Sequence, residues 1–174
     1  MRRIRVAQIG TSVYSHGNEI FGTMKKHPEL FDIVGYALPE GERQRFPQKM
    51  EAFGGYPEMT VEAILADKSI EAVVIETEGV YLTKYALMAA RAGKHVHMEK
   101  PGGISLTDFE ELIGVVKASK TVFHTGYMYR YNPAIRDIMA RVKQGEIGDI
   151  ISVEAQMSGF RGEEQTRFLE AFPG

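Results

Sequence analysis

The stretch from Gly10 to Ser15 follows a short apolar run, Ile4–Ile9, and its residue types and spacing suit phosphate binding. In open α/β sheets a pyrophosphate lies on a glycine-rich turn between the first strand and the next helix. Of the pattern G-x-G-x-x-G the first glycine remains, and serines stand at the other two positions. Serine can donate a hydrogen bond to phosphate, but its Cβ atom opposes a left-handed backbone. The stretch is a candidate cofactor loop or a plain strand-to-helix turn, and its candidate contacts are Gly10, Thr11, Ser12, Val13, Tyr14 and Ser15.

The end of the predicted second strand lacks a feature that the loop would need. An acidic side chain there normally binds the ribose hydroxyls of the adenosine, but the corresponding residue is Leu38. Glu40 or Glu42 could substitute in NAD binding, whereas Arg43 or Arg45 could meet the 2′-phosphate of NADP. Charged residues after a strand are also commonly plain solvated surface. The choice between NAD and NADP therefore stays open.

Two histidines, His95 and His97, stand two apart in a predicted strand and so share one of its faces. Such a pair can bind metal, but no third ligand is in view. We therefore interpret them as packing or surface residues and predict no metal site. The chain has no cysteine, which excludes disulfides, thiolate metal sites and a cysteine nucleophile.

The composition is that of an ordinary globular protein, with 44% hydrophobic and 25% charged residues among 174. A net charge of -2 gives no reason to expect nucleic acid or an anionic membrane as partner. No stretch approaches the roughly 20 apolar residues that span a bilayer. The apolar run after Met1–Arg3 is too short for a signal peptide. We expect a cytoplasmic protein.

Short apolar, β-branched runs alternate with segments of helical period along the first 125 residues. This alternation is typical of right-handed βαβ units. The predicted fold class is α/β, a Rossmann-type parallel sheet with helices on both faces. Strands are predicted over residues 4–9, 33–38, 72–75, around Val96 and Met98, and over 121–125. Helix boundaries are predicted at Thr60 and Ser105 as N-caps and at Gly93 as a stop.

The pattern changes near residue 126. Asn132-Pro133 predicts the start of a helix, and residues 151–157 alternate apolar with polar, which predicts a half-buried strand. No partner strand follows in the sequence, and a lone strand is not stable. We therefore expect a piece of a longer protein that enters a second α/β domain. Pairing of this strand with another copy or with the edge of the first sheet is the alternative.

Four segments together resemble one protein family. Ala92–Pro101 resembles the segment A-G-K-H-V-x-x-E-K-P of the glucose–fructose oxidoreductase / inositol dehydrogenase / MocA family of NAD(P)-dependent oxidoreductases. Asp67–Ile75 is similar to the family's entry into its third strand. Gly126–Pro133 and Gly145–Gly148 resemble its G-(F/Y)-x-x-R-(F/Y)-N-P and G-E-I-G segments. The resemblance runs over nearly the whole chain.

The resemblance implies a dinucleotide-binding Rossmann domain over residues 1–126. Residues 127–174 would begin an incomplete C-terminal domain that binds substrate and mediates homo-oligomerisation. The implied activity is hydride transfer between NAD or NADP and a sugar, cyclitol or related polyol. We expect that the 174-residue chain alone is inactive, because substrate groups of the family lie mainly in the second domain.

The resemblance also implies roles for individual residues. Lys100 would lie beside the nicotinamide and the substrate hydroxyl, where a lysine can hydrogen-bond or protonate the substrate oxygen. Glu99 and Pro101 would shape the turn that aims Lys100, and Thr77 would contact the cofactor. Arg130 would lie at the interdomain junction, where it could contact substrate or cofactor or form a structural salt bridge.

The chain departs from the family pattern at several positions. The family's T-P-x-x-x-H appears as Thr77–Leu82, without the proline and the histidine, and Glu78 brings negative charge to the nucleotide rim. The altered cofactor positions Ser12, Ser15 and Leu38 favour a second hypothesis, a divergent, non-catalytic module that binds a nucleotide or regulates a partner. The retained Lys100 favours the enzyme.

Overall fold

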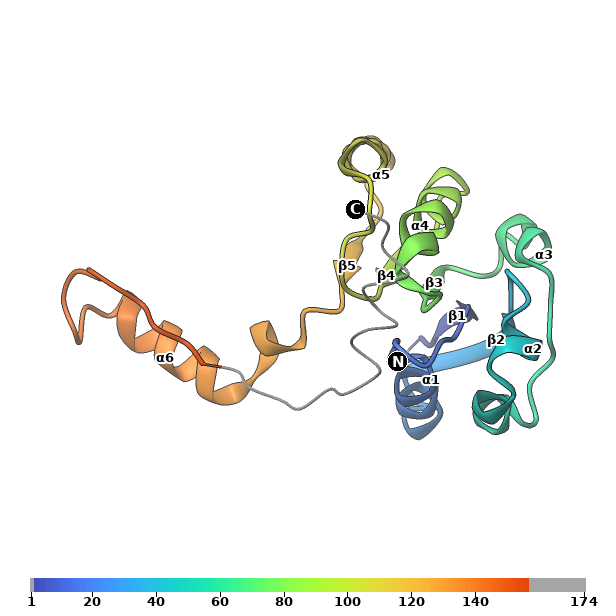
Figure 1. The fold of residues 1–174 in the computed structure, drawn as a ribbon, viewed down its shortest axis with the longest axis horizontal. Coiled ribbons are helices and arrows are strands. Elements are labelled where there is room, and N and C mark those ends of the chain that lie inside the picture. The colour runs from blue at the N-terminus through green and yellow to red at the C-terminus, as the bar shows by residue number, and fades with distance from the viewer. Residues whose placement is uncertain (1, 157–174) are drawn as a thin grey trace. The chain divides into compact units, whose positions relative to one another are not determined.

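Parallel strands form the centre of the first part of the molecule, and the computed structural model describes residues 2–156 of the chain. Within these residues a five-stranded sheet has the order β2-β1-β3-β4-β5 (Figure 1), and every neighbouring pair is parallel. The predicted α/β fold with a Rossmann-type parallel sheet is confirmed. The strands are β1 Ile4–Ile9, β2 Phe31–Ala37, β3 Ala72–Ile75, β4 His95–Met98 and β5 Phe123–Thr125.

The strand order reverses at β1. The chain runs from β1 to β2 on one side and then crosses to β3 on the other, so that Tyr36 of β2 and Val74 of β3 both pair with Gln8. An isolated parallel bridge between Tyr36 and Glu58 lies beyond β2. In open α/β sheets ligands bind at the carboxyl ends of the strands next to such a reversal.

Helices cover both faces of the sheet. Helix α1 lies on one face, whereas α4 and α5 lie on the other (Figure 1). The helices are α1 Gly17–Lys26, α2 Glu42–Arg45, α3 Val61–Ala66, α4 Leu82–Arg91, α5 Leu106–Ser119 and α6 Pro133–Lys143, and the 3-10 helices span Pro47–Phe53, Gly79–Tyr81 and Met128–Tyr131.

Three helix boundaries follow local capping chemistry. Thr60 Oγ1 accepts a hydrogen bond from Ala63 N at 3.0 Å, and Ser105 Oγ accepts one from Asp108 N at 3.2 Å. Gly93 takes a left-handed φ of 73° after α4. All three boundaries were predicted, because caps depend on a few neighbouring residues.

Each face of the sheet has its own hydrophobic core. On the α4–α5 face the buried side chains include Ile9, Val73, Leu82 and Leu112. On the α1 face Phe21 packs edge-on against Phe53, with ring centroids 4.8 Å apart. The two cores hold the carboxyl ends of the strands in place, and the candidate site lies at those ends.

Two predicted strands have other bounds in the structure, and a third prediction fails. The second strand spans Phe31–Ala37 rather than 33–38, and the fifth begins at Phe123 rather than 121. The strand predicted over 151–157 is wrong for residues 151–156, which form neither helix nor strand. Within the described residues no strand pairs with this segment, and an unpaired strand leaves its backbone groups without partners. Met157 lies outside the described residues.

The chain divides into two compact units, Met1–Gly126 and Tyr127–Gly174. In the described part of the second unit, Asn132 Oδ1 accepts a hydrogen bond from Ala134 N at 2.9 Å and starts α6 as predicted. The apolar stripe of α6, which includes Ile138 and Met139, is exposed. Among residues 2–156 no helix is both long and apolar enough to cross a membrane.

Candidate nucleotide-binding site

The turn after β1 is tight because of one glycine. Gly10 has a φ of 89°, and its N–H donates to Ala37 O at 2.8 Å. A Cβ atom at this position would lie 2.6 Å from the backbone nitrogen of Thr77. Both the left-handed backbone and the close approach require glycine here. Gly10 and Thr77, predicted to belong to one site, lie in contact.

The side chains of two serines accept hydrogen bonds from backbone N–H groups of the loop. Ser12 Oγ accepts hydrogen bonds from Tyr14 N at 3.1 Å and Ser15 N at 3.0 Å. Ser15 Oγ accepts from Ser12 N at 3.1 Å and Gly17 N at 3.2 Å. Both serines are buried. Backbone N–H groups at a helix N-terminus are the ordinary ligands of a phosphate; here four of them bond to side-chain oxygens.

A carboxyl group lies under the same loop. Glu42 Oε2 accepts a hydrogen bond from Thr11 N at 3.2 Å, and Oε1 has no hydrogen-bond partner in the described part of the chain. Burial, together with Glu78 and Glu40, raises the pKa of Glu42 from 4.5 to about 9, whereas the Thr11 N–H and Arg45 oppose the shift. Glu42 is therefore a neutral acid at pH 7.

The charged residues around the end of β2 form pairs. Glu40 accepts hydrogen bonds from Lys84 Nζ at 2.6 Å and Tyr85 Oη at 2.7 Å. The Arg45 guanidinium lies 2.6 Å from Glu78 Oε2, and Arg43 pairs with Glu58. Leu38, at the expected ribose position, is half-buried and packs on the α1-face core. Arg43 and Arg45, the two predicted partners of a 2′-phosphate, are thus each paired with a carboxylate.

The turn after β4 carries the predicted catalytic lysine. Lys100 N donates to Glu99 Oε1 at 2.8 Å, and Lys100 Nζ lies 3.8 Å from the same oxygen. The bond between Lys100 and Pro101 is cis. The other oxygen of Glu99 lies 2.9 Å from His16 Nδ1. The lysine therefore extends from a turn that one buried carboxylate ties to the first loop.

A third buried acid, Glu76, directly follows β3. Both carboxyl oxygens of Glu76 lack a hydrogen-bond partner within the described residues. Burial and the nearby Glu99 raise the pKa of Glu76 from 4.5 to about 9. Its Oε1 lies 3.7 Å from His97 Nε2, and His97 Nδ1 lies 2.8 Å from His124 Nδ1. Burial and His124 lower the pKa of His97, so that a neutral acid faces a neutral imidazole.

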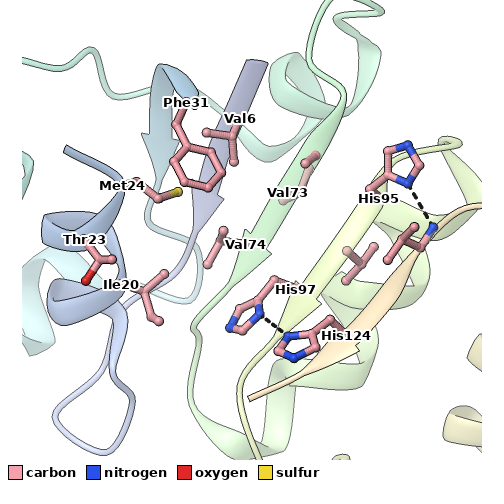
Figure 2. A pocket seen from close by; sticks show the side chains of 13 residues that line it. Val6, Ile20, Thr23, Met24, Phe31, Val73, Val74, His95, His97 and His124 are labelled. Atoms are coloured by element: carbon pink, nitrogen blue, oxygen red, sulfur yellow. Dashed lines mark hydrogen bonds between the residues drawn. The ribbon is translucent and has the colours of Figure 1, made fainter. Parts of the chain in front are cut away.

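The two histidines face a cavity of about 340 Å³ on the α1 face of the sheet (Figure 2). Side chains such as Met24, Phe31 and Val74 give it an apolar lining. His95 also lines this cavity, and its Nδ1 accepts a hydrogen bond from Val122 N at 2.9 Å. Among residues 2–156 no group of three or more potential ligands is arranged to hold a metal ion.

The scaffold fits a dinucleotide at the first turn. A tight glycine turn at the carboxyl end of β1 leads into the N-terminus of α1, next to the strand reversal. A model of the family described as "Oxidoreductase family, NAD-binding Rossmann fold" (GFO_IDH_MocA) matches residues 4–127. The chain belongs to this oxidoreductase family. The resemblance drawn from the four sequence segments is confirmed.

Members of the oxidoreductase family align with much of the chain. An uncharacterized oxidoreductase of Rhizobium meliloti is 33% identical over 158 residues, 88% of this chain and 45% of the relative. The scyllo-inositol 2-dehydrogenase (NAD(+)) of Bacillus subtilis is 34% identical over 85 residues, 49% of this chain and 25% of the relative. A crystal structure of a 3-ketoreductase from Actinomadura kijaniata with NADP is 26% identical, with a TM-score of 0.68 over 86% of this chain and 46% of that one. The chain thus spans less than half the length of these relatives.

Of the predicted site residues, the structure brings the loop residues, Thr77, Glu99 and Lys100 to the carboxyl ends of β1, β3 and β4. Arg130 lies in the second unit, where it is exposed. Sequence reasoning missed His16 and Glu76. Glu76 directly follows the apolar run of β3, and an acidic residue at the end of a buried strand could have indicated a site residue. No sequence pattern indicated His16.

Proposed function

We propose that the protein is an NAD(P)-dependent oxidoreductase that transfers hydride between the nicotinamide and a hydroxyl-bearing carbon of a sugar, cyclitol or related polyol. The observation that carries the proposal is the placement of Lys100 at the carboxyl end of β4, on a turn tied to the first βα loop through Glu99 and His16. Membership of an NAD-binding oxidoreductase family supports it. So do the names of relatives such as the scyllo-inositol 2-dehydrogenase.

Each residue has a distinct role in this proposal. When bound, the nicotinamide accepts or supplies the hydride. Lys100 Nζ, partly exposed and 3.8 Å from Glu99 Oε1, hydrogen-bonds the substrate oxygen and moves its proton. Gly10 and Thr77 form the floor of the pyrophosphate site, and the backbone N–H groups between Ser12 and Gly17 contact its phosphates once the serine oxygens move away from them.

We further propose that residues 1–126 bind the dinucleotide and that residues 127–174 belong to a domain for substrate binding and homo-oligomerisation. Relatives of more than twice the aligned length support this division. Arg130 would then contact substrate or cofactor. The protein would act in the cytoplasm on a small molecule, without a nucleic-acid or membrane partner.

A second function is favoured by one observation, the internal satisfaction of the loop. Four backbone N–H groups of the loop bond to Ser12 and Ser15, and Thr11 N bonds to Glu42. A phosphate must displace these oxygens to reach the N–H groups, which weakens its binding. Under this reading the chain is a non-catalytic module that binds a nucleotide or regulates a partner.

Calorimetric titration with NADH and with NADPH tests the proposal. Saturable binding to the 174-residue chain supports a coenzyme site. Hydride transfer with a panel of polyols, by a protein that contains the second domain, distinguishes the enzyme from the binding module. No heat and no competition with either coenzyme at millimolar concentration, in the 174-residue chain and in the longer protein, would contradict the enzyme and favour the module that regulates a partner.

A further inference from the structure

An ion pair connects the segments on either side of β1. Arg45 ends α2, which follows β2. Glu78 directly follows Thr77, three residues after β3 ends at Ile75. Because β2 and β3 are the two neighbours of β1 (Figure 1), the pair joins the two sides of the strand reversal. The Glu78 side chain is 12% exposed, and the Arg45 side chain 44%. The carboxylate is therefore the more desolvated partner.

The neighbouring cations are occupied in the same way. Arg43 donates to Glu58 and, at 3.2 Å, to Tyr36 Oη. Lys84 donates to Glu40. Within the segments that follow β2 and β3, each of Arg43, Arg45 and Lys84 thus has a carboxylate partner. Glu42 adds a further carboxyl group at this place, and Glu78 and Glu40 contribute, after burial, to its raised pKa.

This arrangement treats the two coenzymes differently. The 2′-phosphate of NADP carries about -2 charge near neutral pH and needs a cation. Drawing Arg45 to that phosphate would leave the mostly buried Glu78 without its partner, which is costly for a desolvated charge. The ribose hydroxyls of NAD carry no charge and need no cation, so NAD leaves the pair between Arg45 and Glu78 intact.

We propose that Glu78 selects NAD over NADP by holding Arg45 in an ion pair, away from the 2′-phosphate of NADP. The inference rests on the proposed coenzyme binding. Arg45 is the cation that NADP would have to draw away from Glu78. Of the three ion pairs at Arg43, Arg45 and Lys84, the pair of Arg45 is the one that joins the end of α2 to the segment after β3. Two measurements are separate: which coenzyme the wild-type chain binds more tightly, and how a change at Glu78 alters the two dissociation constants.

Dissociation constants for NADH and NADPH, measured by calorimetry, test the selection. The wild-type chain should bind NADH at least about tenfold more tightly than NADPH. Glu78→Gln, nearly isosteric and neutral, should tighten NADPH about fivefold or more and leave NADH within about twofold. The double variant with Arg45→Gln should lose that gain. Glu111→Gln, which breaks the exposed pair with Arg91 between α4 and α5, is the matched control and should change neither constant.

The outcomes separate the inference from the function on which it rests. Equal affinity, or a preference for NADPH, overturns the selection while coenzyme binding stands. The selection is also overturned if Glu78→Gln changes the affinities for NADH and NADPH alike. It is overturned as well if the gain in NADPH affinity persists in the double variant with Arg45→Gln. The single variant Arg45→Gln is a further test of the selection, because it should still bind NADH more tightly than NADPH. Absence of binding for both coenzymes overturns the proposed function itself, and the selection with it.

Discussion

His16 Nδ1 lies 2.9 Å from Glu99 Oε2, although the two residues are 83 positions apart in the chain. His16 directly precedes α1, and Glu99 directly precedes Lys100. The other oxygen of Glu99 accepts the Lys100 N–H at 2.8 Å. The carboxylate therefore connects the end of the candidate phosphate loop to the turn that carries the candidate catalytic lysine. Coenzyme binding and lysine placement share one structural link.

Replacing His16 by alanine should loosen the Lys100 turn. Without its partner, the Glu99 carboxylate gains freedom and holds the Lys100 N–H less firmly. We expect amide hydrogen exchange at Lys100 to accelerate roughly tenfold, and turnover of the complete enzyme to fall more than coenzyme affinity. His27→Ala removes a comparable histidine–carboxylate contact with Glu29 beyond the other end of α1 and serves as the control. Unchanged exchange at Lys100 in His16→Ala would contradict the link.

Replacing Lys100 by methionine should separate chemistry from binding. Methionine keeps much of the length of the side chain but cannot hold or move a proton. We expect kcat of an enzyme containing the second domain to fall about 10²–10⁴-fold, while the NADH dissociation constant changes by less than about threefold. Stopped-flow measurement of NADH consumption and calorimetry give the two quantities. A variant with near-normal kcat would remove Lys100 from the proton transfer.

Replacing Ser12 by glycine should strengthen pyrophosphate binding. The change removes the oxygen that accepts from Tyr14 N and Ser15 N and leaves these N–H groups available to a phosphate. Affinity for ADP should rise roughly threefold to tenfold. Ser69→Gly, at the opposite end of the sheet, is the control and should leave ADP affinity unchanged. Weaker ADP binding in Ser12→Gly would mean that the serine hydroxyl is itself a phosphate ligand.

The fold was predictable because its signals are local. Apolar runs, capping residues and glycine stops identify elements from a few neighbouring residues. Strand ends were less predictable, because pairing decides them: Phe31 and Asp32 join β2 through their register with Ile4 and Arg5. Residues 151–156 alternate apolar and polar side chains but form no strand. Such alternation indicates which side chains would share a face of a sheet, but it does not provide a neighbouring strand to pair with.

The site was predictable only where its motifs are contiguous. Gly10 and the Glu99–Pro101 turn can be read from short stretches of sequence. The contacts of Thr11 with Glu42 and of His16 with Glu99 join residues 31 and 83 positions apart, and no local pattern indicates them. The burial of Glu42 likewise depends on the packed loop, so its raised pKa could not be read from the sequence.

The buried Glu76 should make the stability of the first unit depend on pH. Its pKa is about 9 in the folded chain, against an ordinary value of 4.5. Between these values the folded chain retains a proton that the unfolded chain has lost. The free energy of unfolding therefore falls as the pH rises through this window. Glu42 acts in the same direction, so the wild-type protein carries both contributions.

Glu76→Gln should remove one of the two contributions, because glutamine stays neutral at every pH. We expect the variant to gain stability over wild type as the pH rises, on the order of a few kcal/mol between about pH 5 and about pH 8. Thermal unfolding at both pH values measures the difference. Glu62→Gln changes an exposed glutamate in α3 and should run parallel to wild type. If the unfolding temperatures of Glu76→Gln and wild type also ran parallel, Glu76 would be ionised in the folded protein and would have a partner that offsets its burial.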